Sequence, residues 1–290
     1  MINANSTKPA GAAGTVQLGD IAVNRMGFGA MRITGSGIWG EPDDREAAKA
    51  VLHKALDLGV NFIDTADAYG PDVSELLIAE ALYPYPDDLV IGTKGGLLRD
   101  GPGQWRPDGR PEHLRQALNG SLQRLKLEQI DLYQFHRPDP AVPFEESIGA
   151  LADLRAEGKI RHLGLSNVTV AQLEQARQIV PIVSVQNRYN LTDRASEDVL
   201  EACDQAGIAF IPWYPLATGN LATEGSPLTK AARQHNAAPA QLALAWLLKR
   251  SPIMLVIPGT SSAKHLAENV KAAQIALRDD EFEAIAGSSV

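Results

Sequence analysis

Eight short apolar runs rich in β-branched residues alternate along most of the chain with longer segments of helical periodicity. This alternation is typical of parallel strands joined by crossover helices. The predicted strands span residues 25–31, 60–64, 89–94, 130–136, 160–166, 182–186, 208–213 and 253–257. A chain of 290 residues with this pattern predicts an α/β fold of the (β/α)8 TIM barrel type, formed as one unit.

Several residues mark the expected ends of the helices. Gly59 follows a periodic segment at 44–58 and suits a left-handed cap. Asp72 and Glu75 have the spacing of a capping box before a helix at 73–82. Pro111 and Pro143 are predicted at first helical positions, and Gly158 and Gly207 after the ends of the fourth and sixth helices.

The segments outside the strand–helix alternation also carry signals. Residues 1–14 are small, polar and aperiodic, so we expect a disordered tail before a single barrel domain at 15–290. Gly19-Asp20 within 15–24 predicts an N-terminal β-hairpin that caps one mouth of the barrel. The Gly-, Pro- and Asp-rich segments 95–110 and 214–227 are interpreted as loops.

Composition and charge limit the classes of molecule that the protein is expected to bind. A net charge of −8 disfavours binding to nucleic acid or anionic lipid. Without a run of about 20 apolar residues or a signal-peptide pattern, we expect a cytoplasmic protein with no membrane span, as a monomer or small homo-oligomer. Cys203, the lone cysteine, is expected to fill space on a helix, and the six histidines contain no close pair at metal-ligand spacing, so no metal is expected.

Several predicted strands end in a polar residue. Asp64, Lys94 and His136 each end one of them, and Tyr69 lies five residues after Asp64. Active sites of TIM barrels lie at this carboxyl end. Taken singly, Asp64 is more often a cap, Lys94 a solvated charge, His136 a structural histidine and Tyr69 a packing residue.

Together these four residues fit carbonyl reduction. A proton donor is needed near the oxygen that becomes an alkoxide, and tyrosine, with an ordinary pKa of about 10, donates poorly at neutral pH unless a cation lowers that pKa. Lys94 would supply the cation, and Asp64 would offset the cost of burying it. His136 would donate a hydrogen bond to the carbonyl oxygen.

The segment Gly59-Val-Asn-Phe-Ile-Asp-Thr-Ala-Asp-Ala-Tyr-Gly70 resembles the signature of the aldo-keto reductase superfamily. The resemblance extends from about Thr15 to the end of the chain. It includes Thr93-Lys-Gly95, Phe135-His136, Gly164-Leu-Ser-Asn167, Val185-Gln-Asn187, Trp213-Tyr-Pro-Leu216, Ile257-Pro-Gly-Thr260 and Glu268-Asn269.

This resemblance implies a catalytic tetrad of Asp64, Tyr69, Lys94 and His136. It implies that Ser166, Asn167 and Gln186 bind the nicotinamide carboxamide and that Trp213 stacks on the nicotinamide ring. The remaining cofactor contacts that it implies are Gly29 and Met31 near the ribose, Pro215, Leu216, Gly219 and Asn220 over the pyrophosphate, and Gly259, Thr260, Ser261, His265, Glu268 and Asn269 after the last strand.

The cofactor and substrate are less directly indicated. Gly259, Thr260 and His265 stand where many relatives have Lys, Ser and Arg facing the adenosine 2′-phosphate, yet the hydroxyls of Thr260, Ser261 and Ser262 can still bind phosphate. We therefore favour NADPH over NADH. The order Ile-Pro-Gly-Thr-Ser-Ser resembles the bacterial branch similar to pyridoxal reductases, which implies reduction of aldehydes, pyridoxal among them, or ketones.

Three alternatives remain open. The segment 35–40 fits the Gly-x-Gly-x-x-Gly pattern of a Rossmann fold, but Glu41-Pro-Asp43 separates it from the next helix, so we interpret it as a loop over the active-site mouth, where Trp39 would line the substrate pocket. A cofactor-binding regulatory or redox-sensor protein would keep the fold with little turnover. A different barrel enzyme would use Asp64 and His136 as acid and base.

Overall fold

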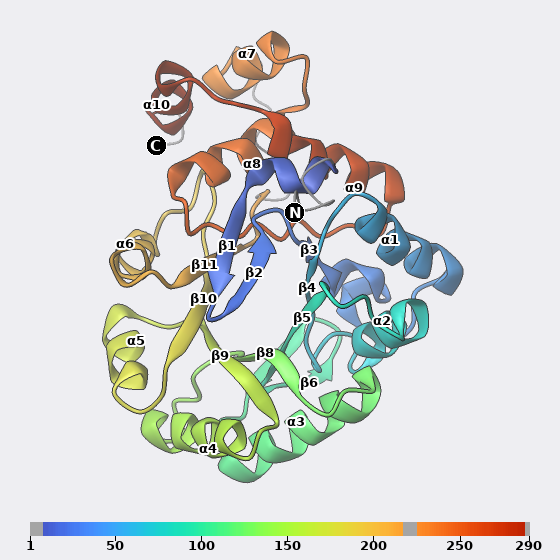
Figure 1. Ribbon diagram of the computed structural model, residues 1–290, viewed down its shortest axis with the longest axis vertical. Helices are drawn as coiled ribbons and strands as arrows, with labels where there is room; N and C mark the ends of the chain where they lie inside the picture. Colours follow the sequence, from blue (N-terminus) through green and yellow to red (C-terminus); the bar gives the residue numbers. More distant parts are fainter. Residues whose placement is uncertain (1–7, 217–224, 288–290) are drawn as a thin grey trace.

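The predicted TIM barrel is confirmed in the computed structural model of the chain, which describes residues 8–216 and 225–287. Seven parallel strands form a curled sheet in the order β11-β10-β9-β8-β5-β4-β3, with helices on its outer side (Figure 1). The strands are β3 (Phe28–Gly29), β4 (Phe62–Asp64), β5 (Val90–Gly95), β8 (Ile130–Phe135), β9 (Ile160–Ser166), β10 (Ile182–Arg188) and β11 (Ala209–Trp213).

Segment 253–257 closes the ring in place of an eighth regular strand. It forms one isolated parallel bridge on each side, Met254 with Phe210 and Val256 with Met26. On the β3 side, the amide of Gly27 donates to the Val256 carbonyl at 2.9 Å. The predicted strand at 253–257 is therefore in the predicted place, although only two bridges join it to its neighbours.

The helices are α1 (Arg45–Asp57), α2 (Val73–Leu82), α3 (Pro111–Leu125), α4 (Phe144–Ala156), α5 (Val170–Arg177), α6 (Glu197–Ala206), α7 (Pro227–Gln234), α8 (Pro239–Arg250), α9 (Ala263–Val270) and α10 (Asp279–Gly287). The predicted signals account for several helix ends: Gly59 follows α1 with φ 86°, Pro111 opens α3 and Gly207 caps α6 with φ 65°.

Cys203 is fully buried in α6, as expected. None of the helices in 8–216 and 225–287 is long and apolar enough to cross a bilayer.

The predicted N-terminal hairpin consists of β1 (Thr15–Leu18) and β2 (Ile21–Asn24), which pair antiparallel. It lies across the mouth of the barrel that faces the viewer in Figure 1. Val16, Leu18 and Val23 pack against the apolar side chains inside the barrel, which include Phe62 and Leu132. This plug closes the amino-terminal end of the barrel, so that a site can open only at the carboxyl end of the strands.

Residues 9–14 do not belong to a disordered tail. Pro9–Ala13 form a short 3-10 helix, η2, whose Ala10 is fully buried and donates its amide to the Leu58 carbonyl at 3.0 Å. The prediction failed because contacts with distant residues, rather than local periodicity, order this segment: η2 packs against the 3-10 helix η6 (Lys271–Gln274) and is hydrogen-bonded to Leu58. The first seven residues lie outside the described part of the chain.

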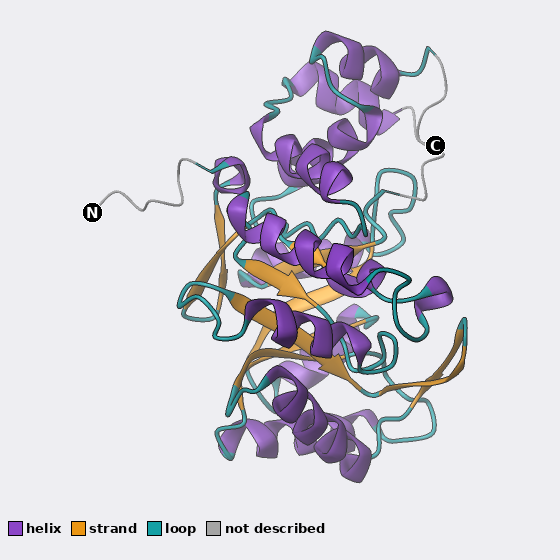
Figure 2. Cartoon of the chain, turned by 90° about the vertical axis from the view of Figure 1, so that its right-hand side faces the viewer, coloured by secondary structure: helices purple, strands orange, loops and turns teal. Residues whose placement is uncertain are grey.

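The predicted loop at 95–110 contains an antiparallel hairpin of β6 (Leu97–Gly101) and β7 (Gln104–Pro107). It extends from the barrel on the side opposite the N-terminal hairpin (Figure 2). Its Gly and Pro residues lie at the turn and the ends, so composition alone indicated a loop. Part of the other predicted loop, residues 217–224, lies outside the described residues.

Two predicted helix starts also differ. Asp72 has φ 67° and makes no side-chain cap, and Glu75 is fully buried, where it accepts a hydrogen bond from Arg124 Nε at 2.6 Å. The capping-box prediction was wrong because a partner 49 residues away competes for Glu75. Pro143 is the residue before α4 rather than its first residue, because its ψ of 128° is not helical.

Candidate active site

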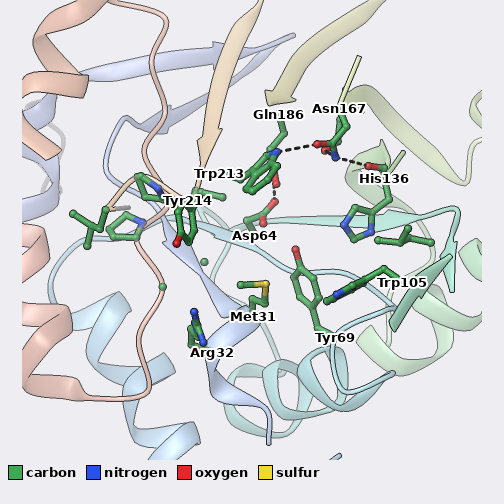
Figure 3. Close-up of a pocket in the computed structure, with 18 of the residues that line it drawn as sticks. Met31, Arg32, Asp64, Tyr69, Trp105, His136, Asn167, Gln186, Trp213 and Tyr214 are labelled. Carbon is green, nitrogen blue, oxygen red and sulfur yellow. Dashed lines mark hydrogen bonds between the residues drawn. The ribbon is translucent and has the colours of Figure 1, made fainter. Parts of the chain in front are cut away.

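A cavity of about 740 Å³ opens at the carboxyl ends of the barrel strands. Figure 3 shows side chains from many elements converging on it, with Trp213 and Tyr214 opposite Tyr69 and Trp105. Asp64 ends β4, His136 follows β8 and Gln186 lies in β10, so residues more than a hundred positions apart meet at one rim.

Asp64, Lys94 and Tyr69 form a buried chain below the cavity. Lys94 Nζ lies 2.6 Å from Asp64 Oδ2, 2.8 Å from the Thr65 carbonyl and 3.3 Å from the Tyr69 hydroxyl. The three donors of the ammonium group are thereby satisfied, which the full burial of Lys94 requires. Because the phenol oxygen accepts from Lys94, the hydroxyl hydrogen of Tyr69 remains available to a molecule in the cavity.

The other oxygen of Asp64 is held by two amides. Gln186 Nε2 donates to Asp64 Oδ1 at 2.8 Å, and Gln134 Nε2 donates to the same atom at 3.0 Å. Gln134 comes from β8 and Gln186 from β10, so the carboxylate is fixed from two further strands. This network orients the carboxylate that faces Lys94.

Burial and the charge of a neighbouring group act in opposite directions on the pKa values of Tyr69 and Lys94. Burial raises the pKa of Tyr69 above its ordinary value, and the nearby Lys94 offsets only part of that rise. Lys94 lowers the pKa of Tyr69, as expected, but the loss of solvent outweighs the cation and the net pKa is raised. For Lys94, burial opposes the charged form, but Asp64 and Tyr69 outweigh it, and the pKa is raised. The lysine is therefore a cation and the tyrosine a neutral phenol at neutral pH.

His136 faces the tyrosine across the cavity. The two rings meet edge to face with centroids 5.8 Å apart. Burial, with smaller contributions from Lys94 and Arg137, holds the pKa of His136 well below its usual range. Its Nδ1 is buried and has no hydrogen-bond partner among the residues that the structure describes. His136 is thus a neutral imidazole, which carries one N–H donor.

A second polar network lies on the β9–β11 side. Asn167, with φ 59°, donates from Nδ2 to the His136 carbonyl at 3.1 Å and to Ser166 Oγ at 3.0 Å. Its Oδ1 accepts from Trp213 Nε1 at 3.1 Å. Figure 3 shows this chain from the indole through Asn167 to His136. The hydrogen bond from Trp213 Nε1 to Asn167 fixes the indole plane at the cavity wall.

The backbone is closely packed at the opposite wall. A Cβ atom on Gly29 would lie 2.7 Å from the Ile257 carbonyl, and one on Gly259 would lie 2.7 Å from the Gly29 carbonyl. Both positions therefore require glycine. They leave a wall of main chain beside Met31, of the kind along which a flat ligand can lie.

Most of the predicted site residues meet in this cavity. Its lining includes Gly29, Met31, Asp64, Tyr69, His136, Ser166, Asn167, Gln186, Trp213, Pro215, Leu216 and Gly259. Lys94 lies directly behind it. Thr260, Ser261, His265, Glu268 and Asn269 are outside the lining, in the turn after Gly259 and in α9. The predicted contacts Gly219 and Asn220 lie outside the described residues.

Sequence reasoning assigned the wrong tryptophan to the cavity wall. Trp105 of β7 lines the cavity, whereas Trp39 does not. Leu97, Arg32 and Arg137 were also missed, as was the buried Gln134 behind Asp64. The burial alternation of β7, in which Trp105 and Pro107 are less exposed than their neighbours, was a signal that could have been read from Gln104-Trp-Arg-Pro107.

A buried phenol, ammonium and carboxylate at the open end of a TIM barrel define an enzyme-like site, and comparison with known proteins assigns the family. The sequence model of the Aldo/keto reductase family matches residues 25–289. The chain belongs to this family, as the signature segment implied.

Individual relatives cover nearly all of the chain. An uncharacterized oxidoreductase of Schizosaccharomyces pombe is 55% identical over 96% of this chain and 91% of its own length. Pyridoxine 4-dehydrogenase of Escherichia coli is 43% identical over 95% of this chain and 98% of its own length. The crystal structure of an aldo-keto reductase from Klebsiella pneumoniae in complex with NADPH has a TM-score of 0.78 and 29% identity, with 93% of each chain covered.

Proposed function

We propose that the protein is an NADPH-dependent carbonyl reductase that converts aldehydes, pyridoxal among them, or ketones to alcohols, with Tyr69 as the general acid. The observation that carries this proposal is the buried chain from Asp64 through Lys94 to the Tyr69 hydroxyl, which ends at the cavity. Membership of the aldo/keto reductase family and the 43% identity to a pyridoxine 4-dehydrogenase support it.

The lining of the cavity fits a nicotinamide cofactor. Trp213 offers an aromatic face held by Asn167, and Ser166, Asn167 and Gln186 offer hydroxyl and amide groups to a carboxamide. The glycine wall and Met31 fit the adjoining ribose. When bound, NADPH supplies the hydride. The NADPH-bound structural neighbour favours NADPH over NADH.

The residues of the chain supply the proton and orient the carbonyl. His136, a neutral imidazole, donates a hydrogen bond to the carbonyl oxygen and sets its direction. As the carbonyl carbon receives the hydride, Tyr69 transfers its hydroxyl proton to the oxygen. Lys94, held by Asp64, then stabilises the phenolate until the tyrosine regains a proton from solvent.

Cofactor titration and an aldehyde panel test this function. We expect the purified protein to bind NADPH more tightly than NADH and to oxidise NADPH when pyridoxal or a nitrobenzaldehyde is added, monitored by loss of nicotinamide absorbance. A protein that binds NADPH but reduces no member of a broad aldehyde and ketone panel is a sensor rather than a reductase. One that binds neither nucleotide contradicts the proposal altogether.

The pH dependence of the reduction follows from the two shifted groups. Tyr69 donates in its protonated form, and its pKa lies above 10.0, so kcat/KM should fall only as the pH rises through that raised pKa. His136 has a lowered pKa and stays neutral, so no inflection is expected near its ordinary value of 6.5. The measurement is kcat/KM for an aldehyde at saturating NADPH from about pH 6 to about pH 11. Loss of activity between pH 7 and 8 would mean that another group donates the proton.

A further inference from the structure

Arg99 of β6 contacts two tryptophans beside the cavity. Its guanidinium carbon lies 3.7 Å from the ring centroid of Trp105 and 5.5 Å from that of Trp39. Contacts of this kind between a cation and an aromatic face gain strength when the pair is withdrawn from water. Arg99 is half-buried here, and burial lowers its pKa.

The same guanidinium joins three segments of the rim by hydrogen bonds. It donates from Nη1 to the Ile38 carbonyl at 2.6 Å and to the Ala68 carbonyl at 3.2 Å, and from Nη2 to the Gly37 carbonyl at 3.0 Å. It also donates to Gly101 and Gln104 within its own hairpin. Arg99 therefore ties the β6–β7 hairpin to the loop at 35–40 and to the residue that precedes Tyr69.

Trp105, which Arg99 contacts, also contacts Tyr69 and lines the cavity. Its ring meets that of Tyr69 edge to face with centroids 6.5 Å apart, and it forms part of the cavity lining. Figure 3 shows Trp105 beside the tyrosine, on the side away from Trp213. Trp105 is thus a wall that a bulky substituent on a carbonyl bound at Tyr69 would meet.

A neighbouring arginine, Arg106, forms an ordinary surface ion pair and so differs from Arg99. Arg106, next to Trp105 on β7, is exposed and forms an ion pair with Asp100, with Nε 2.9 Å from Oδ2. Arg99 has no ion pair with an acidic side chain in the described ranges, only carbonyl oxygens and rings. The contacts of Arg99 therefore hold neighbouring segments in position rather than neutralise an acidic side chain.

We propose that Arg99 is a positioning residue that sets the distance between Trp105 and the Tyr69 hydroxyl, and so makes the site prefer aryl aldehydes to short alkyl aldehydes. This inference rests on the proposed reductase function. An aryl ring seated on the indole gains contact area and a preferred angle, whereas a short alkyl chain at the tyrosine does not extend to the indole.

The test compares kcat/KM for 4-nitrobenzaldehyde and propionaldehyde in the wild type and in Arg99→Ala, Trp105→Ala, the double variant and Arg106→Ala. Arg99→Ala should lower kcat/KM for the aryl aldehyde about ten- to hundredfold, mainly through KM, and that for propionaldehyde less than about threefold. Trp105→Ala should do the same. The double variant should lose little more than either single variant, because both remove one contact.

Two controls separate positioning from folding. Arg106→Ala should leave both kcat/KM values unchanged, since Arg106 is exposed and does not line the cavity. Arg99→Lys should recover part of the aryl preference, because lysine keeps the charge but cannot make the forked hydrogen bonds. The NADPH dissociation constant should stay within about twofold in all variants, since Trp105 and Arg99 lie on the substrate side.

Three results would overturn this inference while leaving reductase activity established: equal losses for both aldehydes, multiplied losses in the double variant, or an unchanged aryl preference in Arg99→Ala. A wild-type protein that reduces neither aldehyde nor any other carbonyl would instead overturn the proposed function, and this inference with it.

Discussion

Replacing Tyr69 by phenylalanine is expected to lower kcat for aldehyde reduction about 10²- to 10⁴-fold, the range over which a positioned proton donor contributes. The substitution removes one oxygen atom and keeps the ring that packs against His136 and Trp105. NADPH binding should therefore survive, with a dissociation constant within about twofold. Steady-state kinetics and a fluorescence titration of the cofactor measure the two quantities.

Tyr133→Phe is the matched control for this prediction. Tyr133 is also fully buried, and its hydroxyl has no hydrogen-bond partner within the described part of the chain. Its removal should leave kcat unchanged. If Tyr69→Phe retained full activity, the proton would come from elsewhere, and if it abolished cofactor binding, Tyr69 would be a structural residue.

Replacing Lys94 by methionine is expected to lower the free energy of unfolding by about 3–5 kcal/mol, the usual cost of leaving a buried charge without its partner. Asp64 is 2% exposed and would face an apolar side chain in place of an ammonium 2.6 Å away. Denaturant unfolding followed by circular dichroism measures the loss. Activity should fall as well, because the phenolate loses its cation.

The double variant Asp64→Asn with Lys94→Met provides the decisive comparison. It removes both charges, and an asparagine oxygen can still accept from Gln134 and Gln186. We therefore expect it to be more stable than Lys94→Met alone. Lys49→Met, which breaks the surface pair with Glu46, should cost less than about 1 kcal/mol. A double variant no more stable than the single one would show that the cost is lost packing rather than an unpaired charge.

The parts of the site that could be predicted from sequence are those that the barrel itself determines. Asp64, Lys94 and His136 could be placed together because each lies at or next to the carboxyl end of a strand, and these strand ends share one rim. The chemistry of carbonyl reduction added Tyr69, and the family resemblance added the amides of Asn167 and Gln186. No long-range contact had to be known for these residues.

The failures share a physical origin in contacts between distant residues. Glu75 had the spacing of a cap but pairs with Arg124. Ala10 is ordered by η6, more than 250 residues away, and by a hydrogen bond to Leu58. Trp105 was overlooked because its segment was rich in turn residues. The lowering effect of Lys94 on the pKa of Tyr69 was expected, but the larger rise from burial was not, because the degree of burial, unlike a neighbouring lysine, cannot be read from a motif.

Segment 253–257 joins its neighbours through one isolated bridge on each side, and its junction with the β3 side lies beside the glycine wall. Gly29 belongs to the strand on one side of that junction, and Gly259 follows the segment on the other side. A dinucleotide lying along this wall would clasp the first and last parts of the barrel at once. Binding of the dinucleotide should therefore stabilise the closed barrel, and the closed barrel should favour binding. The protein with bound cofactor should then resist local opening of the barrel better than the protein without it.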